Sequence, residues 1–271
     1  MKTFKSFYFG IKIFTAIIIF FVIPSICFGA LAVDSQEAAG AGHRGTASGV
    51  AVTWPFNNVG GNLLVCSIVS TNTTGNTPTL STPTYNGVAM TLAGSQLQWD
   101  TSSSVTAIYY LANPATGSNT VSMTGTGTTN FAILGGCMSF SGANTSSPIG
   151  TPTTGKGDIT AGTTATAGSI TAASGNYIFA SGGWGSAGGA AGAGFTRTFL
   201  ANGGGTTAGD DILGEYALSS GAPITPTFTW TGADFWAIIA VEIKAAASAA
   251  APSSVVKVRG KVKIRGKSKF R

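Results

Sequence analysis

The chain has 271 residues and a formal net charge of +6, with 9% charged and 44% apolar residues. That apolar share supports a core and excludes a globally disordered protein, and the length suits one large all-β domain or two small ones. A positive net charge suggests a nucleic-acid-binding protein, but the positions of the charged residues along the chain change that interpretation. The middle holds four Lys and Arg residues against nine Asp and Glu, a net −5, whereas the last 15 residues hold eight basic ones. The sequence therefore predicts a mildly acidic body with a basic tail.

The N-terminus has the features of an export signal. Three lysines precede an apolar run at 13–23, and Ala30-Leu31-Ala32 supplies the small residues that a signal peptidase requires. The run is shorter than the about 20 residues that a membrane-spanning helix needs. We therefore predict a signal peptide over residues 1–32 and a mature chain that begins near Val33. That chain would be secreted or displayed at the cell surface.

Two alternatives concern the same segment. Cleavage after Gly29 also satisfies the small-residue pattern, with Cys27 two positions earlier. A lipoprotein would carry its lipid on Cys27, but Ile26 is bulky where a small residue is expected.

Residues 33–49 are rich in Ala and Gly and predict a flexible lead-in, in which His43 and Arg44 are solvated. The body, 50–244, alternates runs rich in Thr, Val, Ile and aromatic residues with clusters of Gly, Asn, Pro and Ser, a pattern typical of strands and turns. No segment of the body keeps a helical period, so we predict an all-β antiparallel sandwich. Strands are expected at Val50–Trp54, Leu63–Val69, Val105–Leu111, Thr120–Met123, Phe131–Phe140, Tyr177–Ala180, Phe195–Leu200, Ile212–Leu218, Thr227–Trp230 and Phe235–Ile243.

The body contains a weak internal repeat. Segments at 61–65, 109–112, 120–124 and 130–140 recur in the same order at 175–179, 215–218, 227–231 and 234–243. Either two pseudo-repeated halves fill one sandwich, or two small domains follow one another. We favour one domain, because each half alone has few strands with which to bury a core.

Three stretches carry a resemblance to a known group: Val52–Pro55 followed by Gly60–Val65, then Tyr109–Gly117, then Phe140–Ala143. They resemble the glycine- and threonine-rich, lectin-like β-sandwich domains of secreted bacterial and phage-associated proteins. The resemblance covers residues 46–246 and implies a jelly-roll-like fold with surface display, adhesion or glycan contact. It implies no catalytic residues, because its motifs mark strands and turns.

Cys66 and Cys137 are the cysteines that remain after signal cleavage, and both lie in apolar strand-like runs. In an exported chain they can form one disulfide. The alternative is two separate buried thiols that pack as small hydrophobic groups. A zinc site is not expected, because the chain has no C-x-x-C pair and a single histidine.

Two further groups of residues are candidates for a binding or metal site. Asp210, Asp211 and Glu215 form the one acidic cluster, a weak calcium candidate whose alternative is a set of solvated turn acids. Trp184 follows two glycines, and an exposed indole there would stack on a sugar ring; the alternative is a tryptophan that closes the sandwich edge. Neither is a catalytic set, so we predict a protein that is not an enzyme and needs no cofactor.

Residues 245–254 predict a linker, and 255–271 form a basic tail with strict alternation. In a strand this alternation places all the charges on one face and the apolar residues on the other. The basic residues, which are candidates for polyanion or partner binding, are Lys257, Arg259, Lys261, Lys263, Arg265, Lys267, Lys269 and Arg271.

These features together predict an exported binding, adhesion or structural protein that attaches through its tail to a polyanionic polymer or glycan. The alternatives are a self-assembling fibre or coat subunit joined by strand exchange of the tail, and a glycan-active enzyme that uses the 210–215 acids. No permanent membrane span is expected after signal cleavage.

Overall fold

The computed structural model describes residues 29–38, 42–72, 77–101, 103–128, 131–186, 188–201 and 211–247, with only the backbone of 158–159. They belong to one compact unit, Phe28–Ser248. Every helix or strand assigned within these ranges is a strand, and the sheets are antiparallel. None of the described segments is a helix long and apolar enough to cross a membrane. The predicted all-β, antiparallel class is confirmed, whereas the signal peptide up to residue 28 and the tail lie outside the described residues.

A seven-stranded sheet lies inside the unit, with the order β1-β13-β4-β10-β8. β1 and β2 both pair with β13, along different parts of its length. In the same way, β8 and β9 both pair with β10. The strands are β1 (Ala32–Gln36), β2 (His43–Gly45), β4 (Leu63–Thr71), β8 (Thr91–Leu92), β9 (Leu97–Trp99), β10 (Ser104–Ala112) and β13 (Ala132–Ser141). Every residue of β4 is buried, because β4 has strands on both sides and packed layers on both faces. We call this sheet the first inner sheet.

A four-stranded sheet, the first outer sheet, covers one face of the first inner sheet. Its order is β3-β11-β6-β7, with β3 (Val52–Asn58), β11 (Gly117–Met123), β6 (Thr84–Tyr85) and β7 (Val88–Ala89). β3 alternates exposed and buried residues, and it tolerates Pro55 because it is an edge strand. Asn86 and Gly87 join β6 to β7 with φ of 50° and 76°, as a two-residue hairpin turn requires. Two short strands, β5 (Thr79–Leu80) and β12 (Gly125–Thr126), pair separately.

The second half of the chain forms a six-stranded sheet with the order β14-β19-β15-β18-β17 and with β16 on β19. The strands are β14 (Thr153–Thr166), β15 (Tyr177–Trp184), β16 (Ala190–Ala191), β17 (Thr196–Ala201), β18 (Asp211–Leu218) and β19 (Thr227–Ile243). Residues 228, 230, 238 and 240 of β19 all line one core, and Gly232 between them has a φ of 86°. β19 therefore folds over, and its first part lies outside its second part.

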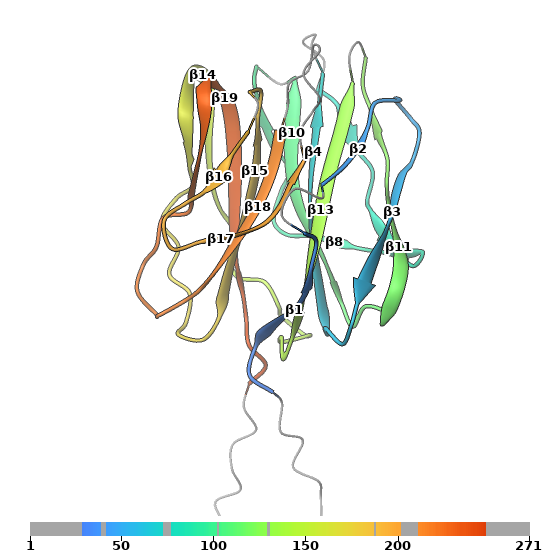
Figure 1. Cartoon of the computed structure of the whole chain (residues 1–271), viewed down its shortest axis with the longest axis vertical. Coiled ribbons are helices and arrows are strands. Elements are labelled where there is room, and N and C mark those ends of the chain that lie inside the picture. Colours follow the sequence, from blue (N-terminus) through green and yellow to red (C-terminus); the bar gives the residue numbers. More distant parts are fainter. Residues whose placement is uncertain are drawn as a thin grey trace, which may run out of the picture. The chain divides into compact units, whose positions relative to one another are not determined.

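Among the described residues, three of the four hydrophobic clusters lie between layers. One lies between the first inner and first outer sheets and includes Trp54, Cys66, Tyr85 and Cys137. A second lies between the first inner sheet and the sheet of the second half, with Val65, Phe140, Phe179, Phe199 and Val241. The third lies inside the folded-over second half, with Trp184, Leu213, Phe228 and Trp230. Figure 1 shows these layers side by side, from β14 and β19 at the left to β3 and β11 at the right.

The pairing pattern supports the internal repeat. β13-β4-β10 in the first half corresponds to β19-β15-β18 in the second, and β1 beside β13 corresponds to β14 beside β19. β3 beside β11 corresponds to the later part of β14 beside the first part of β19. Each half therefore forms its own sandwich-like pair of layers, and the two halves share a core. This arrangement is intermediate between the two alternatives left open by the sequence, which were one sandwich filled by both halves and two small domains in tandem.

The N-terminal boundaries differ from those predicted. Residues 33–49, expected as a flexible lead-in, contain β1 and β2, and both pair with β13. Leu31 and Ala32, assigned by sequence to the signal peptide, also belong to this unit: Leu31 is a core residue and Ala32 pairs with Ser141. The free edge of β13 attracts these segments, because buried backbone groups need partners.

At the C-terminal side, the predicted linker begins inside the fold. Ala245 forms a β-bridge with Ala143, and the Ala246 N–H donates to the Gly142 carbonyl at 2.8 Å. Residues 248–271, with the rest of the linker and the basic tail, lie outside the described residues.

Candidate functional site

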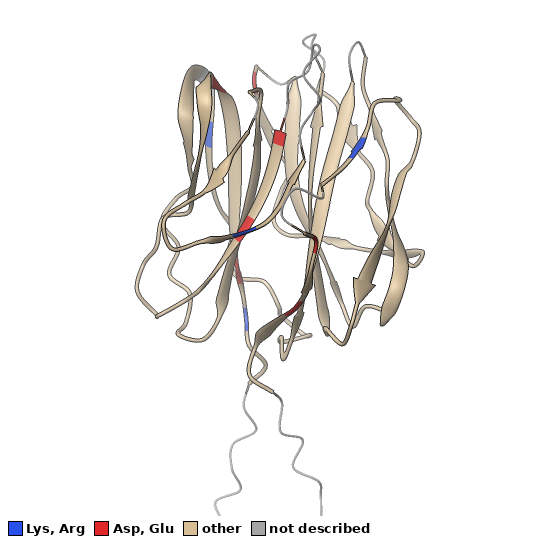
Figure 2. Ribbon diagram, in the orientation of Figure 1, with Lys and Arg blue, Asp and Glu red and all other residues tan. Residues whose placement is uncertain are grey.

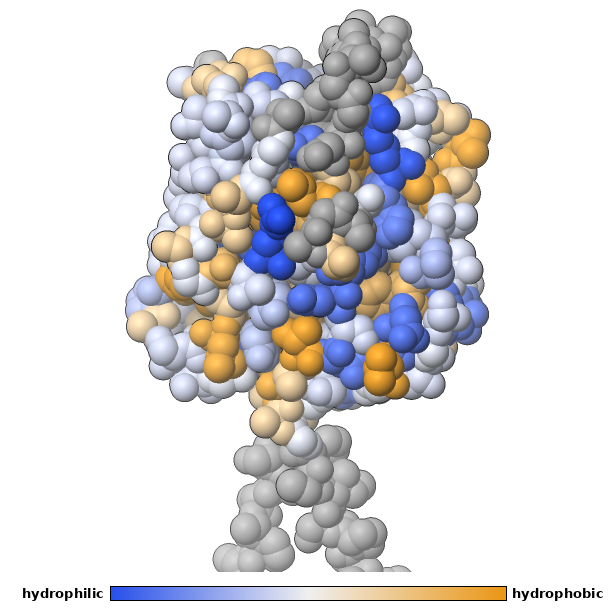
Figure 3. All heavy atoms as spheres, in the orientation of Figure 1, coloured by the Kyte–Doolittle hydropathy of each residue, from blue (hydrophilic) through white to orange (hydrophobic). Residues whose placement is uncertain are grey.

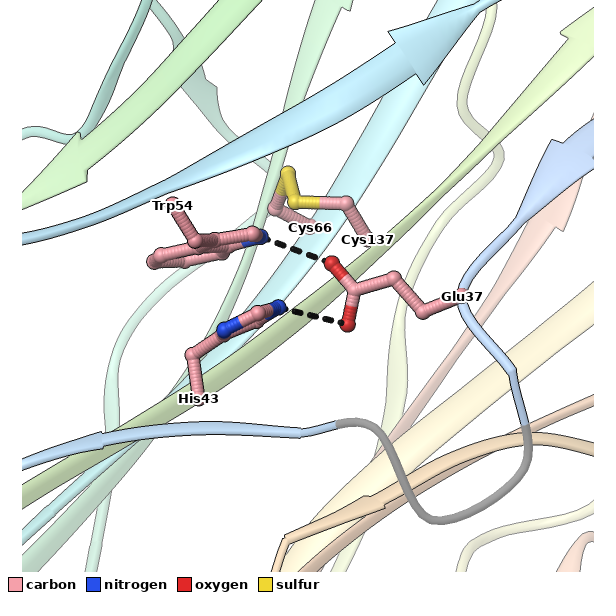
Figure 4. A network of polar contacts seen from close by, with 5 residues as sticks. All are labelled: Glu37, His43, Trp54, Cys66 and Cys137. Atoms are coloured by element: carbon pink, nitrogen blue, oxygen red, sulfur yellow. Dashed lines mark hydrogen bonds and ion pairs between the residues drawn. A yellow bond between two sulfur atoms is a disulfide. The ribbon is translucent and has the colours of Figure 1, made fainter.

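A polar cluster lies where β1 and β2, at the edge of the first inner sheet, approach β3 of the first outer sheet (Figure 4). Glu37, just after β1, accepts a hydrogen bond from Trp54 Nε1 at 2.7 Å. His43 of β2 brings Nε2 within 3.5 Å of the other Glu37 oxygen. The imidazole stacks on the Trp54 indole, with the ring centres 4.5 Å apart and the planes 15° apart. One carboxylate thus holds two stacked rings from two strands.

A disulfide between Cys66 and Cys137 lies beside this cluster and joins β4 to β13 (Figure 4). The two cysteines are directly opposed in the sheet register, and both are fully buried. The disulfide alternative is therefore the one that the structure adopts. It closes a loop with a sequence separation of 71, which stabilises the fold by about 4 kcal/mol in a chain-entropy model.

Glu37 connects three strands in this cluster. Glu37 is 8% exposed, and its backbone N–H donates to the Cys137 carbonyl at 3.4 Å. Its carboxylate then reaches β2 through His43 and β3 through Trp54. Among the described residues, the imidazole has its polar contact with Glu37. The cluster fixes the N-terminal strands to the first half.

A second carboxylate, Asp34 in β1, joins three elements. Asp34 Oδ2 accepts hydrogen bonds from Ser35 Oγ, the Gly60 N–H and Ser139 Oγ at 3.0–3.1 Å. Burial raises the pKa of Asp34, but these hydrogen bonds outweigh it, so the pKa lies below its ordinary value. β1 is therefore held through its side chains as well as through its ladder.

The predicted acidic cluster is only partly brought together. Asp211 and Glu215 lie on the same side of β18 and are both buried, which contradicts their interpretation as solvated turn acids. Asp211 Oδ2 accepts from the Gly188 N–H and Glu215 Oε2 from the Gly192 N–H, each at 2.8 Å. Such donors favour an anion and repel a cation, and the described residues contain no group of three potential metal ligands. Asp210 lies outside them.

Glu215 has an unusual acidity. Burial raises its pKa to about 8, and the hydrogen bond from Gly192 lowers it only in part. Its Oε1 is buried without a hydrogen-bond partner among the described residues. The carboxyl is therefore mostly protonated at neutral pH, and it anchors the segment around Gly192 as a neutral group.

Trp184 does not lie on an exposed loop. It is the last residue of β15, its side chain is 0% exposed, and its ring stacks on Trp230 with centres 5.3 Å apart. The expectation of an exposed indole that contacts a sugar is wrong, because the two preceding glycines belong to a buried strand and not to a loop.

The described part of the chain has few charged residues, and they are scattered over its strands and loops (Figure 2). On the face drawn in Figure 3, hydrophobic residues form separate patches among hydrophilic ones. The eight predicted polyanion-binding residues of the tail lie outside the described residues.

The sequence missed Glu37 and Trp54 as partners of His43, because it placed 33–49 in a lead-in. One signal was available: Leu31 and Val33 alternate with smaller or polar residues up to Gln36, which is a strand period.

Comparison with models of protein families, with curated proteins and with solved structures finds no match for this chain.

Proposed function

We propose that this chain is an exported, non-catalytic protein that binds to a polyanionic surface polymer or glycan through its basic tail. The body would serve as a stable adhesive or structural module. The observation that carries the proposal is the alternation of 256–271, in which every odd position from Lys257 to Arg271 is basic. Solubility would require the charges but not their regular spacing.

Two observations support the location. The buried Cys66–Cys137 disulfide is typical of oxidising compartments outside the cytoplasm. The apolar run at 13–23, preceded by lysines, has the pattern of an export signal. A jelly-roll-like, lectin-like body, which the sequence resemblance implies, fits the same class of surface protein.

The electrostatics favour a polyanion as the partner. The tail places eight positive charges within 15 residues, about 6.6 Å apart in an extended strand. Binding would release counter-ions from the polymer, so affinity should fall steeply as the salt concentration rises.

The test compares three forms of the mature protein on immobilised heparin, which serves as the polyanionic probe. The full chain should bind at low salt and elute as salt rises, and a form that ends at residue 254 should not bind. A third form keeps the composition but breaks the alternation through Val258→Arg with Arg259→Val and Ile264→Arg with Arg265→Ile. It should bind at least threefold more weakly.

Equal binding by the truncated and full forms would refute the proposal, as would binding that is insensitive to salt. Size-exclusion chromatography of the same proteins tests the alternative of strand exchange. Polymers of the full chain that are lost on truncation would favour a self-assembling subunit.

A further inference from the structure

We infer that the export signal is removed between Gly29 and Ala30, so that the mature chain begins at Ala30 and not at Val33. The inference rests on the proposed export, and it concerns where the processing enzyme cuts. In the reaction a signal peptidase adds water across the Gly29–Ala30 peptide bond, leaving a carboxylate on Gly29 and an amino group on Ala30.

The first argument is the burial of Leu31. Its side chain is 7% exposed and belongs to the core between the two halves, together with Phe140, Ala143 and Ile243. Removing a buried leucine side chain costs about 2–5 kcal/mol. Cleavage after Ala32 would discard this residue, whereas cleavage after Gly29 retains it.

The second argument is the backbone of residues 29–32. Ala32 and Val33 form the first two pairs of the ladder between β1 and β13. Gly142, with a φ of 70°, approaches the Gly29 and Ala30 carbonyls so closely that a Cβ on it would collide with both. The folded unit therefore already includes the backbone of Ala30, and a new N-terminus at Val33 would lie inside the ladder.

The third argument is the chemistry of the cleavage site. The peptidase requires small residues at the first and third positions before the cut. Cys27 and Gly29 meet that requirement for a cut after Gly29, and Ala30 and Ala32 meet it for a cut after Ala32. A cut after Ala30 would place Phe28 at the third position, which is too large. The sequence thus allows two sites, and the fold distinguishes them.

The experiment expresses the full chain in a bacterial secretion host and determines the N-terminus of the exported protein by intact mass and N-terminal peptide sequencing. A chain that begins at Ala30 supports the inference, and one that begins at Val33 overturns it while leaving export intact. A chain that stays in the cell with its N-terminus uncut would overturn the proposed export itself.

A matched pair of variants locates the cut independently. Gly29→Tyr places a bulky residue directly before the proposed cut, where a Cβ meets nothing within 4 Å in the fold. This variant should accumulate as precursor or shift its start to Val33. Ala30→Tyr blocks the alternative cut at its third position, and Ala30 is also exposed. It should be processed at the wild-type rate, and the reverse behaviour of the two variants would contradict the inference.

Discussion

In this protein, individual buried side chains connect strands that are distant in the sequence, and some of them connect the two halves. Glu37 joins β2 and β3, and Phe199 of β17 fills the space over Gly136 of β13 in the first half and Gly214 of β18 in the second. Such residues were not evident from the sequence, because their role depends on strands that lie far apart in the chain.

Glu215 should make stability depend on pH. Its folded-state pKa of about 8 lies above its ordinary value of 4.5, so the folded chain keeps a proton that the unfolded chain releases. Stability should therefore fall as pH rises from about 4.5 to about 8, by at most roughly 1.4 kcal/mol per pH unit. Urea unfolding of the wild type at several pH values in this range measures the slope.

Glu215→Gln should flatten that slope, because the amide does not titrate and its oxygen still accepts the Gly192 N–H. Glu242→Gln is the control, since Glu242 accepts hydrogen bonds from Ala173 and Asn176 elsewhere and its substitution leaves Glu215 in place. A slope that survives in Glu215→Gln would show that another group causes it.

Leu31→Ala should lower the free energy of unfolding by about 2 kcal/mol, because it leaves a cavity in the core between the halves. Val59→Ala, at a side chain that is 68% exposed, is the control and should change it little. Chemical denaturation of both variants, made with Ala30 as the first residue, checks the difference. Equal stabilities would mean that Leu31 does not contribute to the core in solution.

At the scale of elements, strands with strong apolar alternation or continuous apolar runs could be predicted. The predicted strands at 63–69, 105–111, 131–140 and 212–218 match β4, β10, β13 and β18 to within two residues. β14 was missed, because its sequence TTGKGDITAGTTAT has little apolar character and it forms by pairing with β19 along its length.

For the candidate site residues, too, the local sequence pattern could be predicted, whereas features that depend on strand pairing could not. Cys66 and Cys137 could be paired in principle because both lie in apolar strand-like runs, but only the register places them opposite each other. Trp184 was misplaced because Gly182 and Gly183 resemble a loop in sequence. In the fold they let β15 approach its neighbours: a Cβ on Gly182 would collide with the Ala237 carbonyl.

Removal of the disulfide by Cys66→Ala with Cys137→Ala should lower the free energy of unfolding by about 2–5 kcal/mol. Thermal unfolding of the oxidised wild type and of the double variant gives the difference. A reductant should lower the wild-type midpoint towards that of the variant and leave the variant unchanged. A variant as stable as the oxidised wild type would contradict the assigned role of the bridge.

At the scale of the molecule, each half forms a sandwich-like part. The core that packs between the two halves joins these parts into one unit. Gly136 of β13 faces that packing, and a Cβ on it would collide with the Phe199 ring. Its neighbour Gly135 faces the other core, where a Cβ would meet the flexible end of Met123 at 3.0 Å and the edge of the Trp54 ring at 3.2 Å. Substitutions at these two glycines therefore test the packing on the two opposite faces of β13.

Gly136→Ala should destabilise the protein by about 1–3 kcal/mol through overpacking, and Gly135→Ala should cost less because Met123 can move. Urea unfolding, with limited proteolysis to detect separation of the halves, distinguishes them. A larger loss in Gly135→Ala than in Gly136→Ala would contradict the proposed packing of the halves.

The position of β19 has a consequence for the order of folding. The first half has every strand of its two sheets by Ser141, so it can assemble while later residues are still being delivered. The second half depends on β19, to which β14, β15 and β16 all pair and which ends only at Ile243. A chain that emerges N-terminus first therefore leaves β14, β15 and β16 without their shared partner strand until β19 has emerged. Until then the edges of the second half lack their partner strand and can pair with other chains.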